Sequence, residues 1–510
     1  MLMDIASFSY LLFISISLLI YWKISYKFQW YVLLADSLIF YFLSATAFTF
    51  AYVFITSISV WLATIYFSQR RNSKKSKKII LVLTISINIG ILAILKYTNL
   101  GIHTINIISK LMHSECYLKD IHLLAPLAIS FYSLQAISYL LDCYWGLVES
   151  DKNFFRVLLF IIFFPQMVSG PISKYSSLSI QLFEEHRFNY EKVTHGLKRI
   201  ALGFLKKLAV SNRIAVLVDY MWNDPNNDHG LFIWLMTALY VLQLYTDFSG
   251  CMDIVIGTSE CFGINVEENF MAPLLSKTIQ EFWQRWHITL GHWLRDYIMY
   301  PLLRTYWLIN FGKMSKTIFG KKQGQKIPTY VAMFFLWSAM GLWHGNSWKY
   351  IIGQGWWFWS MIVIGQIFAY HFQQCKKLLH ITDNNLFFNL LRIIRTNLIF
   401  IWGTLFFRAE SFRDATWRIA HSFNIPPNFF EKTSTVYRET APDFGGKVGM
   451  ILCLVSLLFI IYYDIYLYKG IDFWKKIESR KYRYLAYYYV VFTIIFSLNI
   501  GRQEFLYAQF

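Results

Sequence analysis

Two histidines lie in apolar, aromatic stretches, and histidine is the side chain best suited to moving protons near neutral pH. His344 follows an apolar run that begins at Val331, with a glycine three residues before it and another directly after it. His287 lies among tryptophans. A neutral imidazole can take a proton from an attacking hydroxyl and return it to a leaving group. We therefore predict a general base at His344; a histidine bonded to a carbonyl at a helix break is the alternative.

The segment around His287 has the periodicity of one continuous helix from Glu281 to Tyr297. One face carries the aromatic stripe and His287, and the other is polar. On this pattern His287 points into protein or lipid, whereas His292 lies at a polar interface. An amphipathic interfacial helix with a hydrogen-bonded core histidine is the simpler interpretation of the same pattern. The polar face consists of Glu281, Gln284, Arg285, His292 and Arg295.

Two carboxylates, Asp247 and Asp253, lie in an otherwise apolar segment. Buried carboxylates must be paired, hydrogen-bonded or protonated. These two can orient a histidine, contact Arg285 or Arg295, or cap a broken helix, and we favour structural support over direct catalysis. The remaining candidates for supporting or tunnel-lining roles are Tyr245, Ser249, Gln166, Trp286, Trp343 and Asn346.

Several enzyme classes are disfavoured because their motifs do not occur in the sequence. There is no Gly-x-Ser-x-Gly elbow, no phosphate-binding Gly-Lys loop and no array of metal ligands. None of the six cysteines belongs to a Cys-x-x-Cys pair, so neither a zinc site nor a disulfide framework is indicated. We expect no metal and no bound cofactor.

The composition of the whole chain is that of a membrane protein. Of its 510 residues, 56% are hydrophobic and only 15% are charged. Apolar runs of the ~20 residues needed to cross a bilayer recur from residue 6 to residue 498. The first run lacks a basic leader and a cleavage site and is expected to remain as a helix. We predict one all-α polytopic domain over residues 1–510, with a core at 1–446 and C-terminal helices and tail at 447–510.

Basic residues are concentrated in three short loops, which the positive-inside rule places in the cytoplasm. The same rule accounts for the net charge of +18 without nucleic acid. Counting about twelve spans between these loops places both termini outside and leaves two apolar stretches, Phe154 to Gly170 and Phe282 to Leu303, as re-entrant or interfacial. The polar stretch from Glu410 to Lys447 is predicted to be an external loop. The basic loops are at 70–78, 313–326 and 475–483.

Six stretches of the chain, in this order, resemble the membrane-bound O-acyltransferase (MBOAT) family. The likeness is to its bacterial branch, which includes membrane subunits of alginate and peptidoglycan O-acetylation and the teichoic acid D-alanylation protein. The stretches are Phe131 to Tyr139, Phe164 to Pro171, Leu244 to Gly250, Glu268 to Phe270, Glu281 to Leu290 and Leu342 to Gly345.

The resemblance implies a helical fold around a tunnel, in which a cytoplasmic acyl thioester meets an acceptor from the outer side. The near-invariant histidine of the family matches His344, and its second histidine matches His287. We therefore expect His344 to act as the base, supported by His287. One departure is that Pro301 leads into Leu302-Leu-Arg304 instead of the Gly-Gly pair common in this branch, which puts the donor-binding loop in doubt.

The end of the chain resembles the terminus of the polysaccharide O-acetylation proteins. In that setting a terminal tyrosine is proposed to carry the acyl group, and the matching residue is Tyr507. A phenol activated by a histidine can accept an acyl group and pass it on. Aromatic anchoring of the tail at the membrane surface is the alternative.

These inferences predict an acyltransferase in a bacterial inner membrane. The expected donor is acetyl-CoA or another acyl thioester, and the expected acceptor is an exported or cell-surface polysaccharide reached through an extracytoplasmic partner protein. One alternative is D-alanyl transfer from a carrier protein to teichoic acid. Another is a transporter of lipid-linked saccharide, which should show inverted repeats or paired broken helices; we find none in the sequence.

Overall fold

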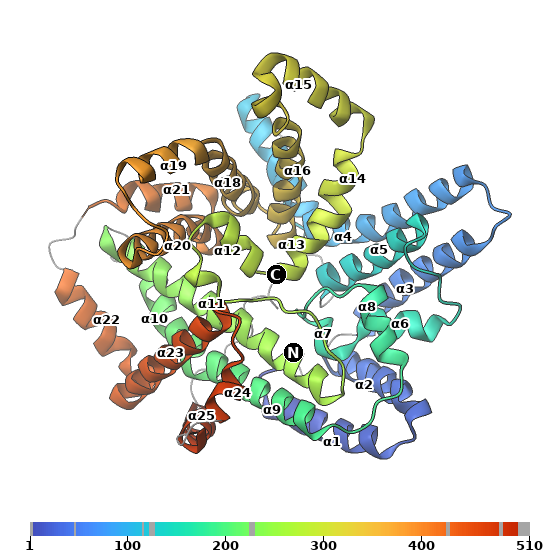
Figure 1. The fold of residues 1–510 in the computed structure, drawn as a ribbon, viewed down its shortest axis with the longest axis horizontal. Helices are drawn as coiled ribbons and strands as arrows, with labels where there is room; N and C mark the ends of the chain where they lie inside the picture. The colour runs from blue at the N-terminus through green and yellow to red at the C-terminus, as the bar shows by residue number, and fades with distance from the viewer. Residues whose placement is uncertain are drawn as a thin grey trace. The chain divides into compact units, whose positions relative to one another are not determined.

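The computed structural model describes residues 4–44, 47–114, 117–121, 128–223, 230–424, 429–478 and 483–497. Nearly all of these residues are helical (Figure 1), and the one β-type pairing among them is an isolated bridge between Phe270 and Trp286. The predicted all-α polytopic class is therefore confirmed. In this part of the chain five helices, or six if one bent pair counts as a span, are long and apolar enough to cross a membrane.

The chain divides into two compact units. The first contains residues up to 204 and residues 251–268. In it α3 packs against α4, α5 and α6, and α2 packs against α1, α6 and α7. Its helices are α1 (Phe8–Lys23), α2 (Gln29–Ser44), α3 (Ala47–Ser68), α4 (Lys74–Leu111), α5 (Ile129–Trp145), α6 (Phe154–Ile162), α7 (Phe164–Met167), α8 (Tyr175–Phe183), α9 (Tyr190–Phe204) and the last turns of α11 (Leu231–Cys261).

The stretch from residue 154 to 170, which was predicted to be re-entrant or interfacial, has the helix break that a re-entrant segment requires, between α6 and α7. Side chains from neighbouring helices satisfy the backbone there, since Ser37 accepts from the Phe164 amide at 3.1 Å and Gln135 donates to the Phe160 carbonyl at 2.7 Å. Irregular backbone at membrane depth requires such internal partners. The break therefore has internal hydrogen-bond partners, while the re-entrant placement of this stretch in a bilayer stays a prediction.

The second unit contains, among the described residues, 205–250 and 269–497. A π-helix, η2 (Leu205–Ser211), directly follows α9 at the start of this unit. The other elements are α10 (Asn212–Asn223), most of α11, α12 (Ile279–Arg285), α13 (Ile288–Leu294), η5 (Arg295–Met299), α14 (Tyr300–Leu303), α15 (Tyr306–Gly324), α16 (Ile327–His344), α17 (Trp348–Tyr350), η6 (Ile351–Trp356), α18 (Trp357–Ile367), α19 (Ala369–Leu378), α20 (Leu386–Arg408), α21 (Phe412–His421), α22 (Phe429–Phe444), α23 (Gly446–Tyr468), α24 (Phe473–Glu478) and α25 (Arg483–Ser497).

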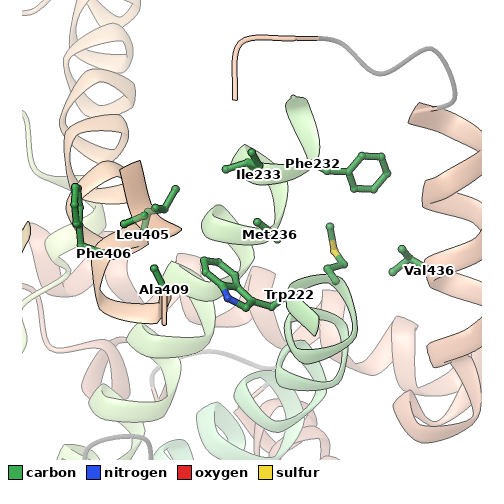
Figure 2. Packing of buried hydrophobic residues seen from close by; sticks show 10 residues of the cluster. Trp222, Phe232, Ile233, Met236, Leu405, Phe406, Ala409 and Val436 are labelled. Atoms are coloured by element: carbon green, nitrogen blue, oxygen red, sulfur yellow. The ribbon is translucent and has the colours of Figure 1, made fainter. Parts of the chain in front are cut away.

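The polar stretch from residue 410 to 447, which was predicted to be an external loop, contains regular helices; its position outside the membrane stays a prediction. It forms α21 and α22. The Ser411 side chain caps α21 by accepting from the Asp414 amide, and Asp414 pairs with Arg418 one turn later. Apolar side chains of both helices enter a core cluster with α10, α11 and α20, seen in part in Figure 2. Burial of these few side chains against other helices organises a segment whose average composition is polar.

Candidate active site

His344 is the last residue of α16 and is 3% exposed. It is positioned by close packing of α16 on the π-helix η6. A Cβ atom on Gly341 would lie 2.7 Å from the Ile351 Cα and 2.8 Å from the Tyr350 carbonyl oxygen, so only glycine permits this approach. Phe407 of α20 packs edge-on against the imidazole, with ring centroids 5.6 Å apart.

His287 lies in a break between two short helices, so the predicted continuous helix from 281 to 297 is wrong. α12 ends at Arg285 and α13 begins at Ile288, with His287 in the left-handed conformation at φ 49° and ψ 49°. The backbone of residues 269–271 causes the break. The Met271 amide donates to the Arg285 carbonyl and the Ile288 amide donates to the Asn269 carbonyl, so these groups are not available to continue the helix.

The structure brings the two histidines together. His287 is 1% exposed, and its ring lies edge-on to Trp343 at 5.1 Å between centroids. Trp343 lies at the same centroid distance from His344. Burial lowers the pKa of His287 well below its ordinary value, and the nearby His344 lowers it further. Both effects disfavour the imidazolium form, so His287 is held as a neutral imidazole.

Aromatic side chains surround this pair. Phe248 of α11 lies edge-on to His287 at 4.9 Å, and the predicted supporting residue Trp286 stacks on Phe282 at 5.6 Å. Phe400 of α20 contacts the rings of Phe282 and Trp286. A wall of this kind excludes water and strengthens electrostatic interactions inside it.

The carboxylate of Asp247 pairs with Lys207 of η2, not with Arg285 or Arg295. The Lys207 Nζ lies 2.5 Å from Oδ1, and both side chains are at most 2% exposed. Tyr245, one turn away on α11 from Phe248, donates to Asp464 of α23 at 2.7 Å. These contacts fix α11 against η2 and α23, which agrees with the predicted structural role.

Asp253 lies in the first unit, where its partner is Arg199 of α9 at 3.1 Å. The same guanidinium makes two hydrogen bonds to Glu268, at 2.6 and 2.5 Å. Gln166 donates to Ser173 at 2.6 Å and is buried. Asp253 and Gln166 thus hold local structure in this unit.

The other predicted residues are less informative about chemistry. Arg285 pairs with Glu281 and lies over the Tyr468 ring, Arg295 pairs with its neighbour Asp296, and Ser249 is buried on α11. Asn346 and His292 are exposed, and the position of His292 at a polar interface stays a prediction. Tyr507 falls outside the described residues.

The sequence interpretation missed the cations that pair with the carboxylates, and it missed Lys349. Lys349 is 9% exposed and donates to the Ala409 carbonyl after the end of α20. A signal existed for Lys206 and Lys207, because lysines inside an apolar stretch need a partner. No comparable signal pairs Arg199 with Asp253, which are 54 residues apart.

Comparison with protein families gives one match. The model described as MBOAT, membrane-bound O-acyltransferase family, matches residues 147–402. This range includes both histidines.

The curated relatives carry related names. The chain is 30% identical to the probable alginate O-acetylase AlgI of Pseudomonas syringae pv. tomato, over 78% of this chain and 71% of that protein. It is 30% identical to the peptidoglycan O-acetyltransferase of Helicobacter pylori, over 54% of this chain and 53% of that protein. The teichoic acid D-alanyltransferase of Bacillus subtilis is 28% identical, over 48% and 59% of the two chains.

Proposed function

We propose that this chain, which belongs to the membrane-bound O-acyltransferase family, carries an acetyl group from a cytoplasmic thioester across the membrane for O-acetylation of a polysaccharide. The chain is a multi-pass membrane acyltransferase, so the transporter alternative is set aside. The choice of acetyl and polysaccharide rests on the names of the relatives that cover most of this chain.

The observation that carries the proposal is the pair of buried histidines, His287 and His344, whose rings both lie edge-on to the ring of Trp343. They are 57 positions apart in the sequence and come from different elements. A dry, aromatic environment keeps an imidazole neutral, which is the form that a general base requires.

In the proposed reaction His344 accepts the proton of the acceptor hydroxyl as the hydroxyl oxygen attacks the thioester carbonyl. The carbon–sulfur bond then breaks, and the proton passes to the departing thiolate, giving an ester and a free thiol. His287 supports His344 by its position and its neutral charge. Orientation of the two reactants in such a site can lower the barrier by roughly 7–11 kcal/mol.

The donor, the partners and the direction of transfer are parts of the same proposal. We infer a donor such as acetyl-CoA from the cytoplasm, an extracytoplasmic partner protein, and a bacterial inner membrane with both termini outside. Tyr507 is proposed as an acyl relay on the outer side. Transfer of D-alanine from a carrier protein is the second candidate, favoured by the D-alanyltransferase relative.

The test is consumption of acetyl-CoA by the purified protein in lipid vesicles, followed by release of free thiol. His344→Ala should reduce turnover by about 100-fold or more, the range for loss of general-base catalysis. The matched control is His292→Ala, the same substitution at an exposed position of α13, which should retain full turnover. Equal turnover of wild type and His344→Ala would refute the proposal.

A second assay decides between the two acyl groups. The same vesicles are supplied with either acetyl-CoA or a D-alanyl carrier protein, and turnover of each donor is measured. In a separate experiment, the cell-surface glycans of a strain that lacks this protein are assayed for ester-linked acetate. Loss of acetate esters is expected. Turnover with the D-alanyl carrier alone would transfer the assignment to the D-alanyl candidate.

A further inference from the structure

The backbone at His287 has a conformation that the local sequence does not favour. The periodicity from Glu281 to Tyr297 is that of one continuous helix, yet residue 287 adopts φ 49° and ψ 49°. A residue other than glycine pays a conformational cost in this left-handed region. Such residues persist only where the surrounding structure holds them.

Asn269 supplies the contacts that hold this conformation. It is fully buried, at 0% exposed. Its Oδ1 accepts two hydrogen bonds from Thr289, from the backbone amide at 3.1 Å and from the hydroxyl at 3.0 Å. Its backbone carbonyl accepts from the Ile288 amide at 3.1 Å. One residue therefore binds three donors on the two residues directly after His287.

Two of these three bonds, those from the backbone amides of Ile288 and Thr289, replace bonds that a continuous helix would make. In such a helix the amides of residues 288 and 289 would donate to carbonyls four residues earlier. Here the Asn269 carbonyl and side chain receive them instead. The bridge between Phe270 and Trp286 holds the other side of the break.

We propose that Asn269, through Thr289, is a positioning residue that directs the His287 imidazole toward Trp343 and His344. The inference rests on the proposed acyl transfer at this histidine pair. Without the three bonds, α12 and α13 can join into the helix that the periodicity favours. Residue 287 would then leave the left-handed region and its side chain would turn away from Trp343.

Thr289 offers a matched pair of substitutions that leaves the backbone bond in place. Thr289→Ser retains the hydroxyl donor, whereas Thr289→Val has nearly the same shape and removes it. Asn269→Leu removes both side-chain bonds. We expect unchanged kcat for Thr289→Ser and a several-fold lower kcat for Thr289→Val. For Asn269→Leu we expect a loss of about 100-fold, the effect of a displacement of about 1 Å in a catalytic group.

The measurements separate positioning from a merely structural role. For each variant, kcat and KM for the acyl donor are measured per folded molecule, together with the midpoint of thermal unfolding. Positioning predicts that kcat falls while KM stays within twofold. A lower unfolding midpoint with unchanged kcat in Thr289→Val would overturn the proposal.

A double-mutant cycle with His287→Ala gives the second test. If Asn269 acts through His287, then Asn269→Leu has no further effect on kcat once the imidazole is gone. An equal fold-loss in both backgrounds would overturn the inference. If His344→Ala loses turnover but none of the Thr289 and Asn269 variants does, the positioning role of Asn269 is overturned. The proposed function is not affected by that outcome. Absence of turnover in the wild-type protein would overturn both.

Discussion

Substitution of Gly341 by alanine tests whether the approach of α16 to η6 positions His344. The added methyl group would lie 2.7 Å from the Ile351 Cα and 2.8 Å from the Tyr350 carbonyl oxygen. Both are backbone atoms, so no side chain can rotate to make room. Ordinary contacts of this kind begin at 3.4 Å, and the two elements must therefore separate by roughly 0.7 Å.

This separation occurs three residues before His344, on the same helix. A misplacement of about 1 Å in a catalytic group can cost about 100-fold in rate. Overpacking of a close-packed interface also costs typically ~1–3 kcal/mol of stability. We expect Gly341→Ala to fold with a lower unfolding midpoint and to turn over thioester more slowly, by up to about 100-fold and mainly in kcat.

The control is Gly365→Ala, the same substitution in α18 of the same unit. A Cβ atom there would meet nothing within 4 Å, and replacing a helical glycine by alanine stabilises by roughly 0.4–1 kcal/mol. Turnover of acetyl-CoA in vesicles is measured for both variants, normalised to folded protein by size-exclusion chromatography. Full turnover by folded Gly341→Ala would show that close α16–η6 packing does not position the histidine.

Three further predictions follow from buried polar groups and from the tail. Asp247→Asn should destabilise the protein by ~3–5 kcal/mol in denaturant unfolding, because it leaves the Lys207 charge buried and unpaired. Combining Asp247→Asn with Lys207→Met should recover most of this loss. If the double variant recovers none of it, the ion-pair explanation is contradicted. Lys349→Met removes a donor to carbonyls at the end of α20 and should cost ~1–3 kcal/mol in the same assay, so an unchanged midpoint would argue against that contact. Tyr507→Phe should abolish acyl transfer to the external acceptor while donor hydrolysis continues, and full transfer would exclude the relay.

Helices and ionisable residues were predictable from sequence because both depend on local composition. Helices such as α1 to α3, α11, α20 and α23 lie in long apolar runs, and a long apolar segment has few alternatives to a helix in a membrane. His344 was conspicuous for the same reason. An imidazole at the end of an apolar run, next to glycines, needs a special environment wherever that run is placed.

The ion-pair partners of the buried charged residues were not predictable from sequence, because they depend on which helices pack together. Asp247 could be identified as needing a cation, but the sequence around it does not distinguish Lys207 from Arg285. The π-helix η2 determines the pairing, because it places Lys207 next to Asp247 of α11. The helices within residues 410–447 were missed for a related reason, since a few buried positions such as Ala415 and Val436 outweigh a polar average.

At His287 the structure departs from the helix that the sequence pattern predicts, and such a departure can indicate a functional position. Local periodicity favours a helix through residue 287, and the structure breaks it with bonds from a residue 18 positions earlier. Three buried hydrogen bonds and a left-handed residue are an improbable way to join two short helices unless the position of that side chain matters. His344 reaches the same place without strain, because glycine removes the steric obstacle at Gly341. Two different structural features, a strained residue at His287 and a close glycine contact before His344, thus bring one pair of imidazoles together, as a catalytic role would require.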